Sequence, residues 1–216
     1  MTLSDRSCGL LLVISSPSGA GKTTLARRLA GEFALRFSVS YTTREARKDE
    51  VQGKDYHFVS RSRFAQMVEG REFAEWAVVH GNQYGTSIAT VNTSLADGVD
   101  CLFDVDYQGG RQLRRLWPAQ TVLCFILPPS MEELERRLRQ RATDASDAIE
   151  RRLAMAHEEL THYGEYDYLV VNDNLDQSYA KLRAIYVAAG CTRVRNDALA
   201  QALLREAGSR TPLQKP

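Results

Sequence analysis

The chain contains 216 residues, of which 44% are hydrophobic and 25% are charged, a composition typical of a globular protein rather than of collagen or a disordered chain. The 28 lysines and arginines nearly balance the 27 aspartates and glutamates, which leaves a net charge of +1. No bulk field therefore draws the protein to nucleic acid or to an anionic membrane, and a polyanionic ligand must be held by local groups. At this length we expect one domain with inserted lobes.

Cysteine usage and the first apolar run indicate the compartment. No C-x-x-C pair occurs among the four cysteines, Cys8, Cys101, Cys124 and Cys191, so we interpret them as buried, reduced thiols. The apolar run at residues 9–14 is too short for a membrane-spanning helix, and it lacks the basic flank and cleavage site of a signal peptide. The sequence predicts a cytoplasmic protein.

A strand, a glycine-containing loop and a helix open the chain in that order. Residues 10–14 are wholly apolar, which is typical of a strand buried on both faces of a parallel sheet. Leucines then recur at helical spacing over residues 22–32. Further apolar runs, each followed by a helical pattern, lie at residues 101–105, 122–127 and 168–171. This alternation predicts an α/β fold in which helices flank a parallel sheet.

The middle of the chain departs from this alternation. Between residues 38 and 99 the strands are short and interleaved with polar residues, so we expect an inserted mixed lobe within a core of residues 1–37 and 100–216. A charged stretch with few large apolar residues, at about 137–152, predicts a helical lid within the core. Residues 209–216 show no periodicity, and we expect them to be a disordered tail.

Residues 16–23 carry a phosphate-binding pattern. They match G-x-x-x-x-G-K-[ST] at every fixed position except the first, where Ser16 replaces glycine. Because the loop follows a buried strand and opens a helix, backbone N–H groups and the helix N-terminus can converge on phosphate oxygens. Lys22 would then neutralise phosphate charge, and the Thr23 hydroxyl would bind Mg²⁺. The alternative is a turn with a solvated lysine. The predicted ATP-binding residues of the loop are Ser18, Gly19, Ala20, Gly21, Lys22, Thr23 and Thr24.

Two aspartates, Asp104 and Asp106, close the strand predicted at residues 101–105. A carboxylate at the carboxyl end of a parallel strand faces the same crevice as the phosphate loop, so Asp104 could hold the water shell of the Mg²⁺ cofactor. A helix cap or a turn residue is the alternative role for such an aspartate. The four histidines share no metal-ligand spacing, and we assign them no role.

The inserted lobe offers a second phosphate site. Arg44 and Arg47 stand three residues apart, and Tyr56 and Tyr84 add two phenol hydroxyls. Two guanidinium forks and two hydroxyls can grip a phosphate without any contribution from the loop. For the tyrosines taken singly, half-buried sheet positions are the alternative.

Glu75 favours guanine as the base beside that phosphate. Guanine presents N1–H and N2–H₂ donors that a carboxylate accepts in parallel, whereas adenine presents an acceptor at N1 and would leave the carboxylate unpaired. Ser40 and Thr86 could bond the remaining base edge. The alternative is that Glu75 belongs to the polar face of an ordinary strand.

In their order along the chain, these motifs resemble those of the guanylate kinase family. The motifs are S-x-S-x-T-T-R-x-x-R from residue 38, G-x-D-Y from 53, E-F-x-E-W from 72, Y-G from 84, D-x-D-x-Q-G from 104 and V-N-D from 171. The resemblance runs from about residue 10 to residue 188. It implies ATP-dependent phosphorylation of GMP, and of dGMP, to GDP.

The resemblance also implies roles for individual residues. The GMP phosphate would be held by Arg44, Arg47, Tyr56 and Tyr84, and the guanine would be read by Ser40, Glu75, Thr86 and Asp106. The lid and hinge arginines that act with Lys22 in catalysis would be Arg137, Arg141 and Arg152, and Asn172 falls where the family places an adenosine-side contact. For the first two of these arginines, a solvated helix face paired with Glu133 and Glu135 is the alternative.

Two other functions stay open at this point. A guanylate-kinase-like binding module without catalysis could dispense with Lys22 and the lid arginines, and a related kinase acting on a ribose bisphosphate would not need Glu75. If GMP is the acceptor, no general base is required, because the second pKa of a phosphate monoester is about 6. We expect nucleotides as partners, no nucleic acid or membrane, and leave homo-oligomerisation open.

Overall fold

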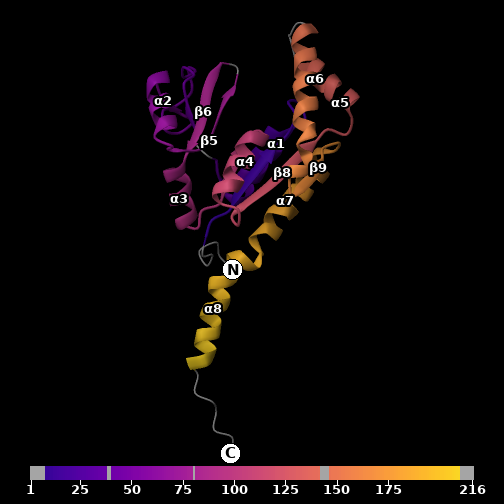
Figure 1. The fold of residues 1–216 in the computed structure, drawn as a ribbon. Coiled ribbons are helices and arrows are strands. Elements are labelled where there is room, and N and C mark those ends of the chain that lie inside the picture. Colours follow the sequence, from indigo (N-terminus) through magenta and orange to yellow (C-terminus); the bar gives the residue numbers. More distant parts are fainter. Residues whose placement is uncertain (1–7, 38–39, 80, 142–145, 210–216) are drawn as a thin grey trace, which may run out of the picture.

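The computed structural model describes residues 8–37, 40–79, 81–141 and 146–209, with the side chains of 141, 146–148 and 209 left out. Its larger sheet has five strands in the order β2-β7-β1-β8-β9, and every pairing in it is parallel. The strands are β1 (Leu11–Ser15), β2 (Arg36–Phe37), β7 (Cys101–Asp104), β8 (Thr121–Leu127) and β9 (Tyr168–Val171). The predicted α/β class is confirmed (Figure 1).

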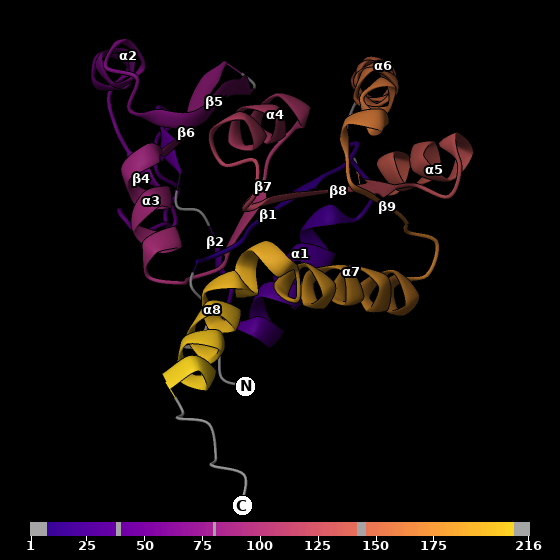
Figure 2. The ribbon, with the colours of Figure 1, turned by 60° about the horizontal axis from the view of Figure 1, so that its bottom comes forward.

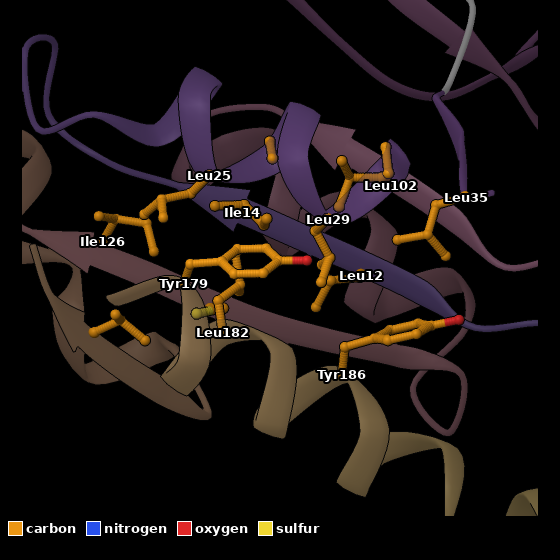
Figure 3. Close-up of a cluster of buried hydrophobic side chains, with 14 of the residues drawn as sticks. Leu12, Ile14, Leu25, Leu29, Leu35, Leu102, Ile126, Tyr179, Leu182 and Tyr186 are labelled. Atoms are coloured by element: carbon orange, nitrogen blue, oxygen red, sulfur yellow. The ribbon is translucent and has the colours of Figure 1, made fainter. Parts of the chain in front are cut away.

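Helices cover both faces of this sheet (Figure 2). They are α1 (Lys22–Phe33) and α7 (Leu175–Gly190) on one face, and α4 (Tyr107–Leu116) with α3 (Ile88–Ala96) on the other. All five residues of β1 are buried because successive side chains enter opposite layers. Leu12 and Ile14 pack against α1 and α7 (Figure 3), while Leu11 and Val13 pack towards α3 and α4. The buried central strand therefore anchors the start of the phosphate loop that follows it.

The smaller sheet has four strands in the order β4-β3-β6-β5. Its elements are β3 (Tyr41–Thr42), β4 (His57–Phe58), β5 (Phe73–Val79), β6 (Asn82–Ser87) and the helix α2 (Arg61–Glu69). Phe64, Met67 and Phe73 form its small apolar cluster. The strands are short, as the sequence predicts, and the division into core and lobe at residues 38 and 99 stays a proposal.

Two helices stand on the opposite flank of the core from this smaller sheet (Figure 1). They are α5 (Met131–Arg141) and α6 (Ser146–Thr161), followed by the short 3-10 helix η2 (Tyr163–Glu165). Leu134, Leu138, Ile149 and Ala156 form the cluster that joins α5 to α6. These lid helices extend well beyond the charged stretch predicted at 137–152, and residues 142–145 between them lie outside the described part of the chain.

The last helix, α8 (Arg193–Ser209), extends away from the core (Figure 1). Its first turn is attached by Arg195, which is 2% exposed and pairs with Asp100 at 2.7 Å. Ser209 is the last residue of this helix, and residues 210–216 of the expected tail lie outside the described range. In residues 8–209, as far as they are described, no helix is long and apolar enough to cross a membrane.

The prediction of four buried thiols is only half right. Cys101 and Cys124 are buried in strands of the larger sheet, whereas Cys8 is half-buried and Cys191 is exposed. Cys191 is exposed because it follows the last residue of α7, outside the layers that bury the strands. All four are free thiols.

Candidate functional site

The loop between β1 and α1 has the backbone of an anion cradle. Gly19 and Gly21 have φ values of 93° and 92°, in the left-handed region that glycine adopts without strain. A side chain at Gly21 would place its Cβ 2.3 Å from the Asn172 amide nitrogen. Gly21 also provides no side-chain cap for α1, so the first N–H groups of that helix remain available to a phosphate. Ser16 is tolerated at its position because its buried hydroxyl donates to the Pro17 carbonyl at 3.0 Å.

Lysine, hydroxyl and carboxylate meet at the mouth of this loop. Lys22 Nζ lies 2.5 Å from Asp104 Oδ1, since β7 runs parallel to β1 and both end at the same edge. Thr23 and Thr24 are exposed on the first turn of α1. Thr23 and Asp104 supply the hard oxygen donors that Mg²⁺ prefers. No group of three or more His, Cys, Asp or Glu ligands occurs in the described ranges.

A hollow of about 270 Å³ adjoins the loop on the lid side. The Asn172 amide donates to the Ala20 carbonyl at 2.7 Å, and Arg137 Nη2 donates to the Asn172 carbonyl at 3.0 Å. Arg137 also donates a hydrogen bond to Glu133 at 2.7 Å. Arg137 therefore makes the ion pair that a solvated helix face predicts, and it also lines the hollow. The lining residues are Gly19, Gly21, Arg137, Gln140, Asn172, Asp173 and Leu175.

The other two lid arginines, Arg141 and Arg152, are not among the described residues that line the hollow. Arg152 is half-buried on α6, and the side chain of Arg141 lies outside the described ones. Sequence reasoning missed the lining residues Gln140 and Leu175. The only signal for the Leu175 side of the hollow is its closeness in sequence to the V-N-D motif at 171–173.

Three residues predicted to hold the acceptor phosphate come together in the smaller sheet and its loops. The Arg44 guanidinium lies 5.4 Å from the Tyr56 ring centre, and the Tyr56 and Tyr84 rings are 5.9 Å apart. The hydroxyl of Tyr84 interacts with the same guanidinium. The side chain of Arg47 is exposed at the edge of this group.

Glu50, which the sequence analysis did not single out, lies on this cradle. Its carboxylate accepts hydrogen bonds from Arg44 Nη2 at 2.8 and 2.9 Å and from the Arg47 backbone N–H at 2.8 Å. These bonds lower the pKa of Glu50 from its usual value, with Arg44 as the larger cause. In this structure the Arg44 guanidinium is therefore paired with a carboxylate of the chain itself. No local pattern could have indicated Glu50, because its partner stands six residues away in a loop.

The predicted guanine contacts lie side by side because of strand register. Glu75 on β5 is the cross-strand partner of Thr86 on β6, and the Thr86 hydroxyl donates to Glu75 Oε1 at 2.7 Å. The Ser40 hydroxyl lies 3.4 Å from that of Thr86. Glu75 is only 4% exposed, so the polar face of an ordinary strand does not describe it.

Burial gives Glu75 an unusual proton affinity. Desolvation raises the pKa of Glu75 to about 7, with a contribution from the nearby charge of Asp106, while the Thr86 hydrogen bonds act in the opposite direction. A Cβ at Gly109 would lie 3.3 Å from Glu75 Oε2, so a side chain there would crowd that oxygen. The carboxylate is poised to accept hydrogen bonds from a ligand.

The prediction that Asp106 closes the strand at residues 101–105 is wrong. Strand β7 ends at Asp104, and Asp106 is the N-cap of α4, where its carboxylate accepts the Gly109 N–H at 3.0 Å. The aspartate takes this place because its side chain satisfies a donor that the first turn of a helix leaves free. Its second oxygen lies 3.4 Å from the Gln108 amide, and its charge acts on Glu75.

A glycine loop between a parallel strand and a helix, with lysine and carboxylate at its mouth, defines a P-loop nucleotide-binding protein. The profile described as "Guanylate kinase" matches residues 9–189. The chain belongs to the guanylate kinase family, and it is therefore an enzyme of the nucleoside monophosphate kinase class.

Individual relatives agree with this assignment. A guanylate kinase from Dechloromonas aromatica is 49% identical over 201 residues, which cover 91% of this chain and 99% of the relative. One from Paramagnetospirillum magneticum is 52% identical over 188 residues, 87% of this chain and 88% of the relative. The crystal structure of guanylate kinase from Anaplasma phagocytophilum superimposes with a TM-score of 0.74 at 33% identity, covering 99% of this chain and all of that one.

Proposed function

We propose that this chain transfers the γ-phosphoryl group of ATP to GMP, giving ADP and GDP, with the loop at 16–23 as donor cradle and the smaller sheet as acceptor site. One observation carries the choice of acceptor: the buried carboxylate of Glu75 pairs across the sheet with Thr86, which stands two residues after the cradle residue Tyr84. A ribose bisphosphate has no base, and so it lacks the paired N–H donors that guanine would offer this carboxylate. A binding module would not need Lys22 at the mouth of the loop.

The acceptor side needs position rather than proton transfer. The GMP phosphate is largely ionised at neutral pH because its second pKa is about 6, so its oxygen attacks without a general base. Arg44, Arg47, Tyr56 and Tyr84 hold the other oxygens, and Glu75, Thr86, Ser40 and Asp106 fix the base. With both ends held, the attacking oxygen is kept in line with the donor.

The donor side supplies charge neutralisation. Backbone N–H groups from Ser18 to Thr24 and the Lys22 ammonium bind the polyphosphate, and Arg137, Arg141 and Arg152 close on the transferring group. Thr23 and Asp104 would hold Mg²⁺, which supplies further neutralisation of phosphate charge when it is bound. Asn172 and Arg137 border the hollow that would take the adenosine. Closure over both nucleotides excludes water, which would otherwise hydrolyse the donor.

We extend the proposal to dGMP, because the residues assigned to the acceptor read its base and its phosphate and none is assigned to the 2′-hydroxyl. We also place the reaction in the cytoplasm, where thiols such as Cys101 and Cys124 stay reduced.

Release of ADP, measured with GMP, AMP, CMP and UMP as acceptors, tests this function. We expect a kcat/KM for GMP at least about 100-fold above that for AMP, because AMP leaves Glu75 buried and unpaired. Glu75→Gln should lower the value for GMP by about 10- to 100-fold, whereas Glu69→Gln, at an exposed position of α2, should leave it unchanged. Equal rates with AMP would rule out the guanine assignment.

A further inference from the structure

The C-terminal end of the lid helix α6 is joined to α4 by a group of side chains that none of the roles above uses. Helix α6 ends at Thr161, and His162 leads directly into η2. The His162 ring stacks on the Tyr107 ring, with 3.6 Å between the ring centres and 13° between the ring planes. The Arg111 guanidinium donates two hydrogen bonds to the Glu165 carboxylate, at 2.9 and 2.5 Å. We call Tyr107, Arg111, His162 and Glu165 the root cluster.

The members of the root cluster also contact one another across these two pairs. His162 Nδ1 lies 2.9 Å from Glu165 Oε1, and the Arg111 guanidinium lies 5.5 Å from the Tyr107 ring centre. The hydrogen bonds from Arg111 are the largest cause that lowers the pKa of Glu165 from its usual value, so the carboxylate is ionised and paired at neutral pH. Two parallel bonds between a guanidinium and a carboxylate fix direction as well as distance. The end of α6 is therefore held in one orientation on α4.

Helix α4 is tied to the acceptor side as well. Its N-cap is Asp106, which precedes Tyr107 and which we assign to the guanine. The Gln112 side-chain oxygen accepts the Trp76 backbone N–H at 3.3 Å, and Trp76 follows Glu75 on β5. Helix α4 therefore contacts the acceptor sheet through one set of residues and the end of the lid through another.

We propose that Arg111 and Glu165 are positioning residues for phosphoryl transfer. Through the root cluster they set the direction of α6 relative to α4, and with it the place of Arg152 over the transferring group. The proposal rests on the function assigned above, because Arg152 has this task only if the chain transfers a phosphoryl group. Neither Arg111 nor Glu165 touches a nucleotide in this scheme.

The length of α6 makes its orientation critical. Arg152 precedes His162 by about ten residues, which span about 15 Å along an α-helix. Over such a lever a tilt of about 4° moves Arg152 by about 1 Å, and a misplacement of that size can lower a rate about 100-fold. Because Arg152 acts on the transferring group, the loss should fall on kcat. An exposed ion pair adds little to stability, so the chain should stay folded without it.

Steady-state kinetics of GMP phosphorylation in Arg111→Met and Glu165→Gln tests the proposal. We expect each change to lower kcat about 10-fold and to leave the KM for GMP and for ATP within about twofold of the natural values. The combined variant should lose no more than either single variant, because all three remove the same contact. The matched control is Glu135→Gln, which removes an exposed ion pair with Arg139 on α5 and should leave kcat unchanged.

Amide hydrogen exchange measures the attachment of α6 without any reaction. In the absence of nucleotides, the amides of α6 should exchange faster in Arg111→Met and Glu165→Gln than in the natural chain, because the end of the helix is no longer held. The control Glu135→Gln should exchange like the natural chain. Circular dichroism verifies that each variant is folded.

Three results would overturn the proposal. The first is a folded variant that keeps the natural kcat, and the second is a loss confined to the KM for GMP or ATP, since a lid arginine is positioned after both substrates are bound. The third is unchanged exchange of α6, whatever the rates. If the natural chain does not phosphorylate GMP, the proposed function is wrong, and the exchange of α6 alone then decides whether the root cluster holds the lid.

Discussion

At the scale of single residues, Glu75 shows how burial and recognition are linked. Its carboxylate receives hydrogen bonds from the hydroxyl and the backbone N–H of Thr86 in a site that is almost closed to solvent. Burial without a full set of partners disfavours the ionised form. Guanine donors would supply the missing partners, so the same burial that destabilises the empty site increases its preference for a base with two donors.

The affinity for GMP should therefore depend on pH through Glu75. Below its pKa of about 7 the carboxyl group is protonated, and it must lose that proton to accept two N–H donors. We expect the KM for GMP to rise as the pH falls from about 8 to about 6, approaching tenfold per unit below the pKa. In Glu75→Gln only the titration of the GMP phosphate remains. Identical pH profiles for the two proteins would contradict this role.

The same residue should limit stability at alkaline pH. Its pKa is about 7 in the folded chain against 4.5 when unperturbed, so between these values the folded state binds more protons than the unfolded state. The free energy of unfolding then falls as the pH rises through this window. Glu75→Gln should raise it at about pH 8 by up to about 3 kcal/mol, measured by urea denaturation. A loss of stability in this variant would show that burial of the charge is not the dominant effect.

Arg44 provides a test of the phosphate cradle. Its planar guanidinium donates through Nη2 to Glu50 and through Nη1 to the Glu45 carbonyl while it lies against the Tyr56 ring, and lysine cannot reproduce this two-nitrogen geometry. We expect Arg44→Lys to raise the KM for GMP about tenfold, the effect of one lost charged hydrogen bond, with the KM for ATP unchanged. Arg61→Lys, at an exposed site on α2, is the matched control. An increase confined to the KM for ATP would contradict the assignment of Arg44 to the GMP phosphate.

At the scale of elements, Gly21 in the loop and Gly31 in α1 should respond in opposite ways to a side chain. Gly21 has a φ of 92° and no space for a Cβ, whereas Gly31 lies within α1, where a Cβ would meet nothing within 4 Å. Gly31→Ala should stabilise the chain by about 0.5–1 kcal/mol because alanine favours helix. Gly21→Ala should destabilise it and raise the KM for ATP. Thermal melts and ATP kinetics check both, and equal effects would contradict the loop geometry.

The core elements could be predicted because their signals are local. The run at residues 10–14 reads as a strand buried on both faces, and Leu12 with Ile14 and Leu11 with Val13 do enter opposite layers. The loop after it was recognisable from its residue types and spacing alone.

Positions that depend on distant partners could not be predicted in the same way. Asp106 looks like the end of a strand, but it caps α4 because the Gly109 N–H needs an acceptor. Glu50 has no local pattern, since its partner Arg44 stands in a loop. The buried pair of Arg195 and Asp100 joins residues 95 positions apart.

At the scale of the whole molecule, the two anion cradles belong to different sheets. The donor loop follows β1 of the larger sheet, and the acceptor cradle is built on the smaller one, with α5 and α6 on the opposite flank (Figure 1). In-line transfer requires both phosphates within bonding reach. We therefore expect the molecule to close when both nucleotides are present.

Closure should be visible in solution. We expect the radius of gyration from small-angle X-ray scattering to decrease when GMP and a non-hydrolysable ATP analogue are added together, and to decrease less with either alone. AMP in place of GMP, with the analogue present, is the control. A radius that is the same in all states would show that the structure is already closed.

A crystal structure of the chain with GMP is the sharpest test of whether Glu75 and Arg44 bind the acceptor, because it locates the nucleotide independently of any rate. We predict that the guanine N1–H and N2–H₂ lie within hydrogen-bond distance of the Glu75 carboxylate, and that the phosphate replaces Glu50 or joins it on Arg44. A nucleotide bound away from both Arg44 and Glu75 would contradict it.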